Sequence, residues 1–535
     1  MTKTVNGCYT LLVFLAGASA AAALLPAADW KALSDRGNEA YHRGAYQEAE
    51  KFYADALSQA TNFGDRDDRV AASLSGLATA YRAEGKYSQS EKLYQRAIEL
   101  RETNFGRAHP ETAVLLNNLG SLYQIQGRYA EAEPLFKKCL AVWEQAPGDN
   151  RRHIATSLNN LAGIYRTRAH YAEAEPLYRR ALALNEAAEG GEHPSVALVL
   201  NNLALLLENQ GKFAAARSLA EEALAIRERT LGPQHPDTAI SLNNLADVLR
   251  DQVYLDQAEP LYQRALAIRE KTLGPDHPQV AETLNSLAIL YKERGRYDDA
   301  ERMLRRAVNI FDNSLGQAHP RVAAGWNNLG QLAFTRHDFH EAARLYRRAM
   351  AIWEKTLGPN QPETASTLIN LGALSFARKK LDDAERFYRR ALEINQAHFG
   401  PANPKTAADL NNLGTVLYAR KRYNEAETLY RRSLEIYEHS VGTDHATVSD
   451  PLLNLAAVYV ARRRFPEAAQ FYGRGMAILE RVMGSDNARL AGRLEIYAAL
   501  LRKSENYAEA EKVQVRATGI RVKTALRAEE DSETR

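Results

Sequence analysis

The amino-acid sequence repeats itself every 42 positions. An Asn-Asn pair occurs at residues 117–118, 159–160, 201–202, 243–244, 327–328 and 411–412, so each occurrence follows the one before it after one or two periods. Where the letters change, at 285–286, 369–370 and 453–454, the spacing is kept. A fixed period of roughly 20 to 50 residues indicates stacked supersecondary units. The 535 residues are also too many for one ordinary hydrophobic core, which agrees with a repeat array.

Each repeat predicts two helices. Apolar residues at helical spacing predict a first helix from about Pro110 to Gln126 and a second from near Tyr129 to about Glu144. The linker between repeats reads Leu-Gly-Pro-Gln-His-Pro at residues 231–236. Its glycine ends one helix, and its second proline fits the first turn of the next. The sequence therefore predicts an all-α protein.

Small and large residues also recur at fixed places within the repeat. One repeat has Leu119, Gly120, Tyr123, Ala132 and Phe136, and the next has Leu161, Ala162, Tyr165, Ala174 and Tyr178. This pattern resembles the tetratricopeptide repeat (TPR), and the long period resembles the subclass typified by kinesin light chain. The resemblance covers nearly all of residues 30–523. It implies a right-handed superhelical α-solenoid of stacked antiparallel helix pairs, and the aligned second helices give twelve pairs.

The two ends of the array diverge most from the repeat pattern. We therefore expect an N-terminal capping helix pair at 29–66, a central array at 67–485 and a C-terminal capping helix pair at 486–523. A terminal repeat lacks one neighbour and needs a more polar outer face to stay soluble. Residues 524–535 are charged and without apolar periodicity, so we expect them to be disordered.

The segment 1–28 differs in composition from the rest of the chain. Residues 8–25 form an uncharged apolar run, followed by small residues. This composition predicts a signal peptide with A-x-A-like cleavage sites after Ala20 or Ala28. An uncleaved membrane anchor is the alternative, because about 20 apolar residues span a bilayer. The sequence thus predicts an exported protein, periplasmic or extracellular, or one held on a membrane by its N-terminal segment.

The second asparagine of each pair belongs to a row that we call the asparagine ladder. The ladder consists of Asn118, Asn160, Asn202, Asn244, Asn328, Asn370, Asn412 and Asn454. Its position on the helix points away from the apolar stripe of its own repeat, and asparagine is a poor helix former. A side-chain amide offers a donor and an acceptor, so it can pair with a peptide unit. The family resemblance implies that this helix lines a concave groove, so the ladder is our candidate peptide-binding site.

A structural role is the alternative for the ladder. Its amides would then bond across neighbouring repeats and set the register of the helices. We expect mainly this role for the first asparagine of each pair, which lies nearer the boundary between repeats. That row consists of Asn117, Asn159, Asn201, Asn243, Asn285, Asn327 and Asn411.

Nucleic acid is not a predicted partner. The formal net charge is only +3. A basic row along the second helices has no aromatic residues interleaved with it. This row consists of Arg96, Lys138, Arg180, Arg264, Arg306, Arg348, Arg390, Arg432 and Arg474. A glutamate often lies four residues before an arginine there, as in Glu175 and Arg179, which is typical of a solvated helix face. We therefore expect the basic row to form a charged outer face.

No motif predicts catalysis, a metal or a cofactor. Linker histidines recur once per repeat, so they form a line along the array and not a cluster, and we interpret them as residues that precede helix starts. The sequence has no nucleophile elbow, no phosphate-binding glycine loop and no paired carboxylates outside the repeat phase. We therefore predict a protein that is not an enzyme and needs no cofactor.

The sequence indicates two alternative functions for the protein. The first is an extracytoplasmic scaffold that binds an extended peptide or a partner protein in the concave groove. The alternative is a structural or spacer subunit of an envelope secretion or polysaccharide-export assembly, with contacts through the outer face or the ends of the array. In either case the partner is a protein, and a membrane is contacted only through a possible uncleaved N-terminal anchor.

Overall fold

The computed structural model describes residues 26–533, and all regular structure within them is helical. Most of the predicted leader, residues 1–28, lies outside this range, and α1 begins at Pro26. None of the helices in the described part of the chain combines the length and the apolar character needed to cross a membrane.

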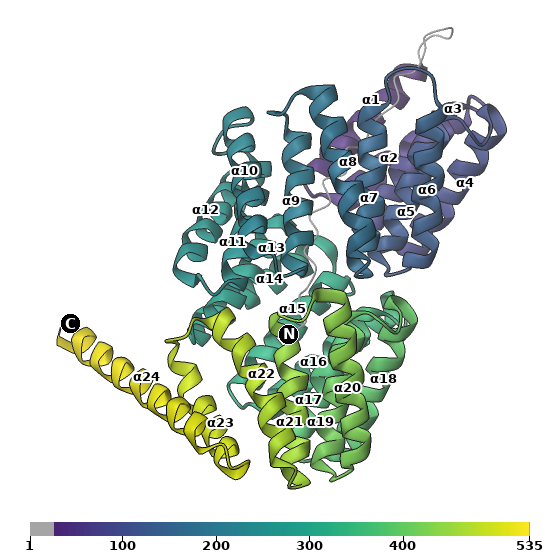
Figure 1. Cartoon of the computed structure of the whole chain (residues 1–535). Helices are drawn as coiled ribbons and strands as arrows, with labels where there is room; N and C mark the ends of the chain where they lie inside the picture. The colour runs from purple at the N-terminus through teal and green to yellow at the C-terminus, as the bar shows by residue number, and fades with distance from the viewer. Residues whose placement is uncertain (1–25, 534–535) are drawn as a thin grey trace. The chain divides into compact units, whose positions relative to one another are not determined.

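Twenty-four α-helices in the described residues form twelve antiparallel pairs, which we number as repeats 1 to 12 (Figure 1). The first helices are α1 (Pro26–His42), α3 (Asp68–Ala83), α5 (Pro110–Ile125), α7 (Arg151–Thr167), α9 (Pro194–Asn209), α11 (Pro236–Asp251), α13 (Pro278–Glu293), α15 (Pro320–Thr335), α17 (Pro362–Ala377), α19 (Pro404–Ala419), α21 (Ser449–Ala461) and α23 (Ala491–Lys503). The second helices are α2 (Tyr46–Thr61), α4 (Tyr87–Phe105), α6 (Tyr129–Gln145), α8 (Tyr171–Glu189), α10 (Phe213–Thr230), α12 (Leu255–Leu273), α14 (Tyr297–Leu315), α16 (Phe339–Thr356), α18 (Leu381–Phe399), α20 (Tyr423–Val441), α22 (Phe465–Met483) and α24 (Tyr507–Glu533). Single 3-10 turns, η1 (Ala446–Val448) and η2 (Ala488–Leu490), precede α21 and α23.

These helices confirm the predicted all-α solenoid of helix pairs. The helices expected at 110–126 and from 129 to about 144 are α5 and α6, each within one residue of its predicted end. The tail differs from the prediction. Helix α24 continues through Glu533, so residues 524–533 are helical where we expected disorder. The charged composition of this segment did not prevent it from extending a helix that is already formed, because elongation is far easier than nucleation.

The linker histidines start the first helices. The Nδ1 atom of His109 accepts a hydrogen bond from the backbone N–H of Glu111 at 3.2 Å, and Pro110 occupies the first helical position. The same cap forms at His193, His235, His277 and His319. A cap of this kind satisfies one of the N–H groups that a helix start leaves without a partner. The interpretation of these histidines as residues before helix starts is confirmed.

An aromatic ring from the second helix fills the space beside a small residue of the first helix. A Cβ atom at Gly120 would lie 2.9 Å from the Phe136 ring, and one at Gly414 would lie 2.7 Å from the Tyr430 ring. Phe136 is fully buried. This contact fixes how closely the two helices of a repeat approach, which explains why both residue types recur once in every repeat.

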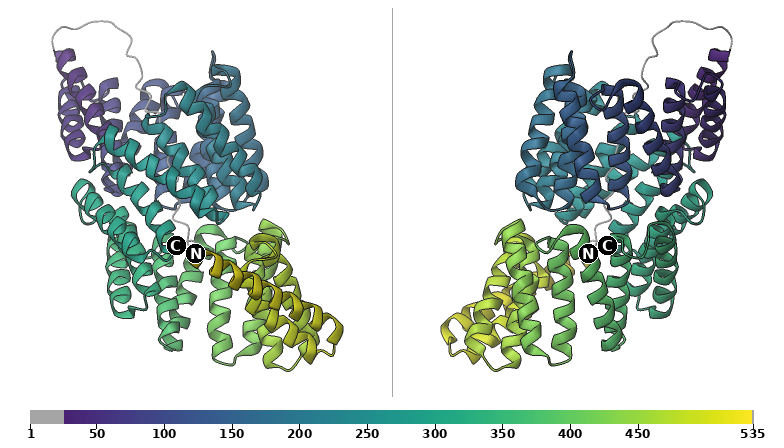
Figure 2. Two further views of the ribbon diagram at one scale, coloured as in Figure 1. Left: turned by 90° about the vertical axis from the view of Figure 1, so that its left-hand side faces the viewer. Right: turned by 90° about the vertical axis from the view of Figure 1, so that its right-hand side faces the viewer.

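The helices group into two compact units, Met1–Asn370 and Leu371–Arg535. The boundary lies inside α17. Within each unit, consecutive helices lie side by side as stacked hairpins (Figures 1 and 2).

Candidate functional site

The first helices form the inner wall of each unit. Each packs against the second helix of its own repeat and that of the preceding repeat, as α11 packs against α12 and α10. Neighbouring first helices also contact each other, for example α9 with α11 and α19 with α21, whereas in the described residues no neighbouring second helices pack as closely. The first helices are therefore closer together, which places them on the concave side.

Four amides of the asparagine ladder bond across neighbouring repeats. In each case the ladder amide donates to the first-row asparagine of the preceding repeat. The bonds run from Asn160 to Asn117, Asn202 to Asn159 and Asn370 to Asn327, each at 2.8 Å, and from Asn454 to Asn411 at 2.9 Å. These four bonds join neighbouring repeats, which is the kind of contact that the structural alternative expects. Each donating asparagine still has a second amide hydrogen, because Asn carries two N–H donors.

The other four ladder residues make no side-chain hydrogen bond to the described residues. Asn244, Asn328 and Asn412 are half-buried in the inner wall, whereas Asn118 is buried. For Asn412 the cause is in the sequence, because the preceding repeat has Ile369 in place of an asparagine. For Asn244 the cause is conformational. Asn201 Nδ2 donates to Ser241 Oγ at 3.0 Å, and in this rotamer Asn201 Oδ1 is buried without a partner and does not accept from Asn244. Three half-buried amides are thus open on the concave side.

Side chains on either side of the asparagine ladder give the inner wall both apolar and polar groups. Leu198 and Leu205 flank Asn202 on α9, and both are half-buried. On α13, Glu282 and Ile289 occupy the same two places. The wall between α9 and α13 therefore offers apolar contact beside the amides.

The charged groups of this wall are largely paired with one another. Arg250 Nη1 bonds Asp247 Oδ1 at 2.8 Å, and Tyr262 donates to the same oxygen at 2.6 Å. Arg321 pairs with Glu282 at 2.8 Å. These contacts neutralise the strongest charges of the wall.

Burial also favours the neutral forms of two further groups on the wall. It raises the pKa of Glu293 and lowers the pKa of Lys292. Both groups lie on α13, close to the paired Asp247 and Arg250. The charges of the inner wall that are engaged within the protein are therefore those of the pairs Asp247–Arg250 and Glu282–Arg321.

The basic row lies on the outside and is engaged between repeats. Arginines of the second helices bond glutamates of the preceding second helix. The pairs are Arg180–Glu144, Arg264–Glu228 and Arg306–Glu270 at 2.7 Å, Arg474–Glu438 at 2.5 Å and Arg516–Glu480 at 2.8 Å. Their arginine side chains are 38–51% exposed. The predicted charged outer face is confirmed, and it does not offer a row of free cations to an anionic partner.

Cys139 is not poised as a nucleophile. Its side chain is buried beside Ser157, and burial raises the pKa of its thiol to about 11. The thiol therefore stays protonated at neutral pH. In the part of the chain that the structure describes, no three His, Cys, Asp or Glu side chains are grouped as metal ligands.

Comparison with protein families identifies the repeat. A family model described as Tetratricopeptide repeat matches residues 31–103, 111–187, 188–252, 255–313, 321–397 and 405–481. A second model with the same description matches residues 285–355. A search of curated proteins gives no match.

Two solved structures are similar to parts of the chain. One is a putative kinesin light chain from Podosopora anserina with nearly identical TPR-like repeats, which is 28% identical, covers 37% of this chain and 95% of that chain, and gives a TM-score of 0.32. The other is BtubC (BKLC) from P. vanneervenii, which is 25% identical, covers 44% of this chain and 91% of that chain, and gives a TM-score of 0.34.

Proposed function

The chain belongs to the tetratricopeptide repeat family, and on that premise we propose that it is a scaffold that binds an extended segment of a partner protein along the concave wall of its first helices. The repeats as a class mediate contacts between proteins, which supports a role in protein binding rather than catalysis.

The open amides of Asn244 and Asn328, both in the first unit, carry the proposal, and Asn412 is an open amide of the second unit. A half-buried amide that makes no bond to the described residues keeps its donors and acceptor for a bound peptide, and leaving them unpaired costs free energy. Stacked helices lie roughly 8 to 10 Å apart, and an extended peptide advances about 3.3 Å per residue. The open amides lie two repeats apart, so one of them can meet the backbone of a bound segment at about every fifth or sixth residue.

The side chains around the asparagine ladder indicate which kind of peptide segment could bind there. Charges near Asn244 are paired within the protein, and Leu198, Leu205 and Ile289 supply apolar contact. A strongly charged segment would have to compete with these internal ion pairs. We therefore propose a guest of low net charge with apolar side chains at intervals, held mainly through its backbone.

Replacing Asn244 and Asn328 together by alanine is expected to weaken partner binding by about 1 to 3 kcal/mol, at roughly 1 kcal/mol for each hydrogen bond lost. Thermal stability should stay near that of the wild type, because neither side chain bonds another described residue. The partner is first isolated by affinity purification of the full chain from its native envelope. Its affinity for wild-type and variant protein is then measured by calorimetry.

Asn159→Ala provides the matched control. It removes the acceptor that Asn202 uses, so it should lower stability by about 1 kcal/mol and leave affinity nearly unchanged. Unchanged affinity in the Asn244/Asn328 variant, with its fold intact, would reject groove binding. Binding that depends instead on the outer face or the array ends would support the spacer-subunit alternative.

We also propose that the protein is exported. The support is the leader-like composition of residues 1–28, which lie mostly outside the described structure. N-terminal sequencing of the protein from its native envelope is expected to start after Ala20 or Ala28. An intact N-terminus in a membrane fraction would instead indicate the anchored form.

A further inference from the structure

Three contacts join parts of the first unit that are far apart in the sequence. A Cβ atom at Gly44 would lie 2.9 Å from the His277 ring, one at Gly85 would lie 3.0 Å from the His319 ring, and one at Gly127 would lie 3.2 Å from Pro362. The two members of each pair are separated along the sequence by nearly the same interval, between five and six repeats. The constant offset shows that one coil of the array lies directly against the next.

Each contact pairs the same two features. The turn between the helices of repeats 1, 2 and 3 meets the helix start of repeats 7, 8 and 9 in that order. Figure 2 shows the N-terminal hairpins, in purple, next to the teal helices of the same unit. We call this set of contacts the inter-coil seam.

The seam contains a hydrogen bond with a defined direction. His319 Nδ1 accepts from the backbone N–H of Arg321 at 3.1 Å, so its proton lies on Nε2, which faces the backbone oxygen of Ala83 at 3.1 Å. A neutral ring satisfies both partners at once. Burial is the main cause that lowers the pKa of His319 to about 3, which agrees with this neutral form.

Apolar side chains also cross the seam. Leu357, just after α16, packs against the core cluster that contains Tyr87 and Leu119 of repeats 2 and 3. Tyr87 is buried although it is the first residue of α4. The seam thus removes apolar surface from water, as an interface does.

The turns that meet the seam have glycine, whereas most of the other turns between paired helices have a residue with a side chain. The turn residue has positive φ in all twelve repeats, yet side chains are tolerated there in repeats 4, 6 and 8 to 12. Those residues are Ala169, Val253, His337, Lys379, Lys421, Arg463 and Glu505. Positive φ alone therefore does not require glycine at this turn. The three turns that meet the seam are all glycine, because a side chain there would collide with the opposite coil.

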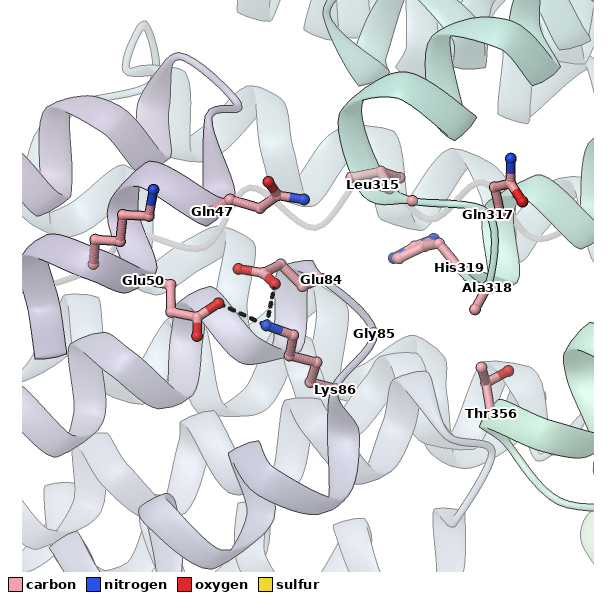
Figure 3. A pocket seen from close by; sticks show the side chains of 12 residues that line it. Gln47, Glu50, Glu84, Gly85, Lys86, Leu315, Gln317, Ala318, His319 and Thr356 are labelled. Carbon is pink, nitrogen blue, oxygen red and sulfur yellow. Dashed lines mark hydrogen bonds and ion pairs between the residues drawn. The ribbon is translucent and has the colours of Figure 1, made fainter.

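A water-accessible cavity of about 510 Å³ opens within the seam (Figure 3). Lys86 bridges Glu50 at 2.6 Å and Glu84 at 2.7 Å on the side of repeats 1 and 2. Gln317 and His319 lie on the opposite side. Gln47 and Gln317 are exposed and line this cavity from opposite coils, so they can report whether the seam is closed.

We propose that the inter-coil seam is a latch that holds the first unit as a closed coil and shuts the side of its concave groove. A partner segment then enters that groove from its ends or after the latch opens. This consequence for access rests on the proposed function, whereas the latch itself does not.

Cross-linking across the seam tests the latch in the full chain. Gln47→Cys and Gln317→Cys are combined with Cys8→Ser, while Cys139 stays buried and unreactive. A short bismaleimide is expected to link the two new thiols within one molecule, as peptide mass spectrometry can verify. The control pair Gln47→Cys and Gln234→Cys, with Gln234 in an earlier linker, should not be linked.

Adding Gly85→Lys to the seam pair should open the latch and reduce the cross-link several-fold. The matched control is Gly295→Lys, because Gly295 has the same φ of +74° and no atom within 4 Å of an added Cβ. Lysine is already accepted at this turn in Lys379 and Lys421. Should Gly85→Lys lower the helical circular dichroism signal, the same comparison is made with Gly44→Lys.

No cross-link in the seam pair would overturn the latch, as would equal yields in the Gly85→Lys and Gly295→Lys proteins. Neither result bears on the ladder, which is tested by the affinity of the Asn244/Asn328 variant. The two proposals can therefore fail separately.

Discussion

Replacing Asp409 by threonine is expected to stabilise the second unit, by up to about 4 kcal/mol above pH 7, since each tenfold change in proton affinity corresponds to about 1.4 kcal/mol. Asp409 accepts a hydrogen bond from Asn395 at 2.6 Å, but its other carboxylate oxygen is buried without a partner. Burial raises its pKa from 3.8 to about 7, and the size of this rise gives the upper value.

The pH dependence has a definite sign. The folded state prefers the protonated carboxyl, so the penalty is absent below the unfolded pKa of 3.8, grows as pH rises and is complete above about 7. The gain from Asp409→Thr should therefore be large at pH 8 and small at pH 4. Threonine is a sound replacement, because Thr283 and Thr367 occupy the same repeat position and Thr283 accepts a bond from Arg269 at 2.7 Å.

Urea unfolding of wild type and variant at both pH values measures this effect. Asp382→Thr serves as the control, because the Asp382 side chain is 89% exposed and should change stability little at either pH. A gain that is the same at pH 4 and pH 8, or a loss at pH 8, would show that the buried charge is not the cause.

Replacing Tyr346 by alanine is expected to destabilise the first unit by about 3 to 5 kcal/mol, the usual cost of removing a buried aromatic ring. Tyr346 is 2% exposed, and a Cβ atom at Gly330 would lie only 2.7 Å from its ring. Removing the ring leaves a cavity that the backbone of α15 cannot fill without moving. The measurement is the free energy of unfolding from urea denaturation followed by circular dichroism.

Tyr346→Phe is the matched control, because Phe136 fills the same position in repeat 3. It should cost no more than about 1 kcal/mol, since the ring is kept. A loss in Tyr346→Phe as large as that in Tyr346→Ala would assign the effect to the hydroxyl group and not to the contact with Gly330.

Most of the fold could be predicted because each repeat contains the residues that mark its helix ends and its buried helix faces. The glycine and proline of the linker mark helix ends, and the apolar spacing marks the buried faces, so α5 and α6 were placed within one residue. The end of α24 could not be placed in this way. A charged segment with no apolar stripe gives no signal that distinguishes a helix extension from a disordered tail.

The candidate site could be predicted only in part. Helical spacing placed the asparagine ladder on the helix face away from its own core, and the first helices do form the inner wall. Where the preceding repeat has an asparagine at this place, its rotamer decides whether the ladder amide stays open. Asn159 accepts from Asn202, whereas Asn201 turns to Ser241 and leaves Asn244 open. A sequence in which both pairs read Asn-Asn does not distinguish these two cases.

The inter-coil seam could not be predicted from the sequence, because a repeat period indicates contacts only between repeats that are adjacent in the chain. A contact between coils that are more than five repeats apart depends on the curvature that accumulates over many small rotations. One signal was present in the sequence. Gly44, Gly85 and Gly127 occupy a turn position where most later repeats have a larger residue.

Photo-cross-linking in cells that produce the protein tests whether a partner lies along the concave wall of the first helices. A photoreactive residue is placed at Gln331, three residues after Asn328 on the inner wall, or at Arg344, whose side chain is 56% exposed on the second helix of the same repeat. We expect a partner adduct from position 331 that is lost in the Asn244/Asn328 double-alanine background, and no adduct from position 344. An adduct from position 344 alone would contradict this expectation.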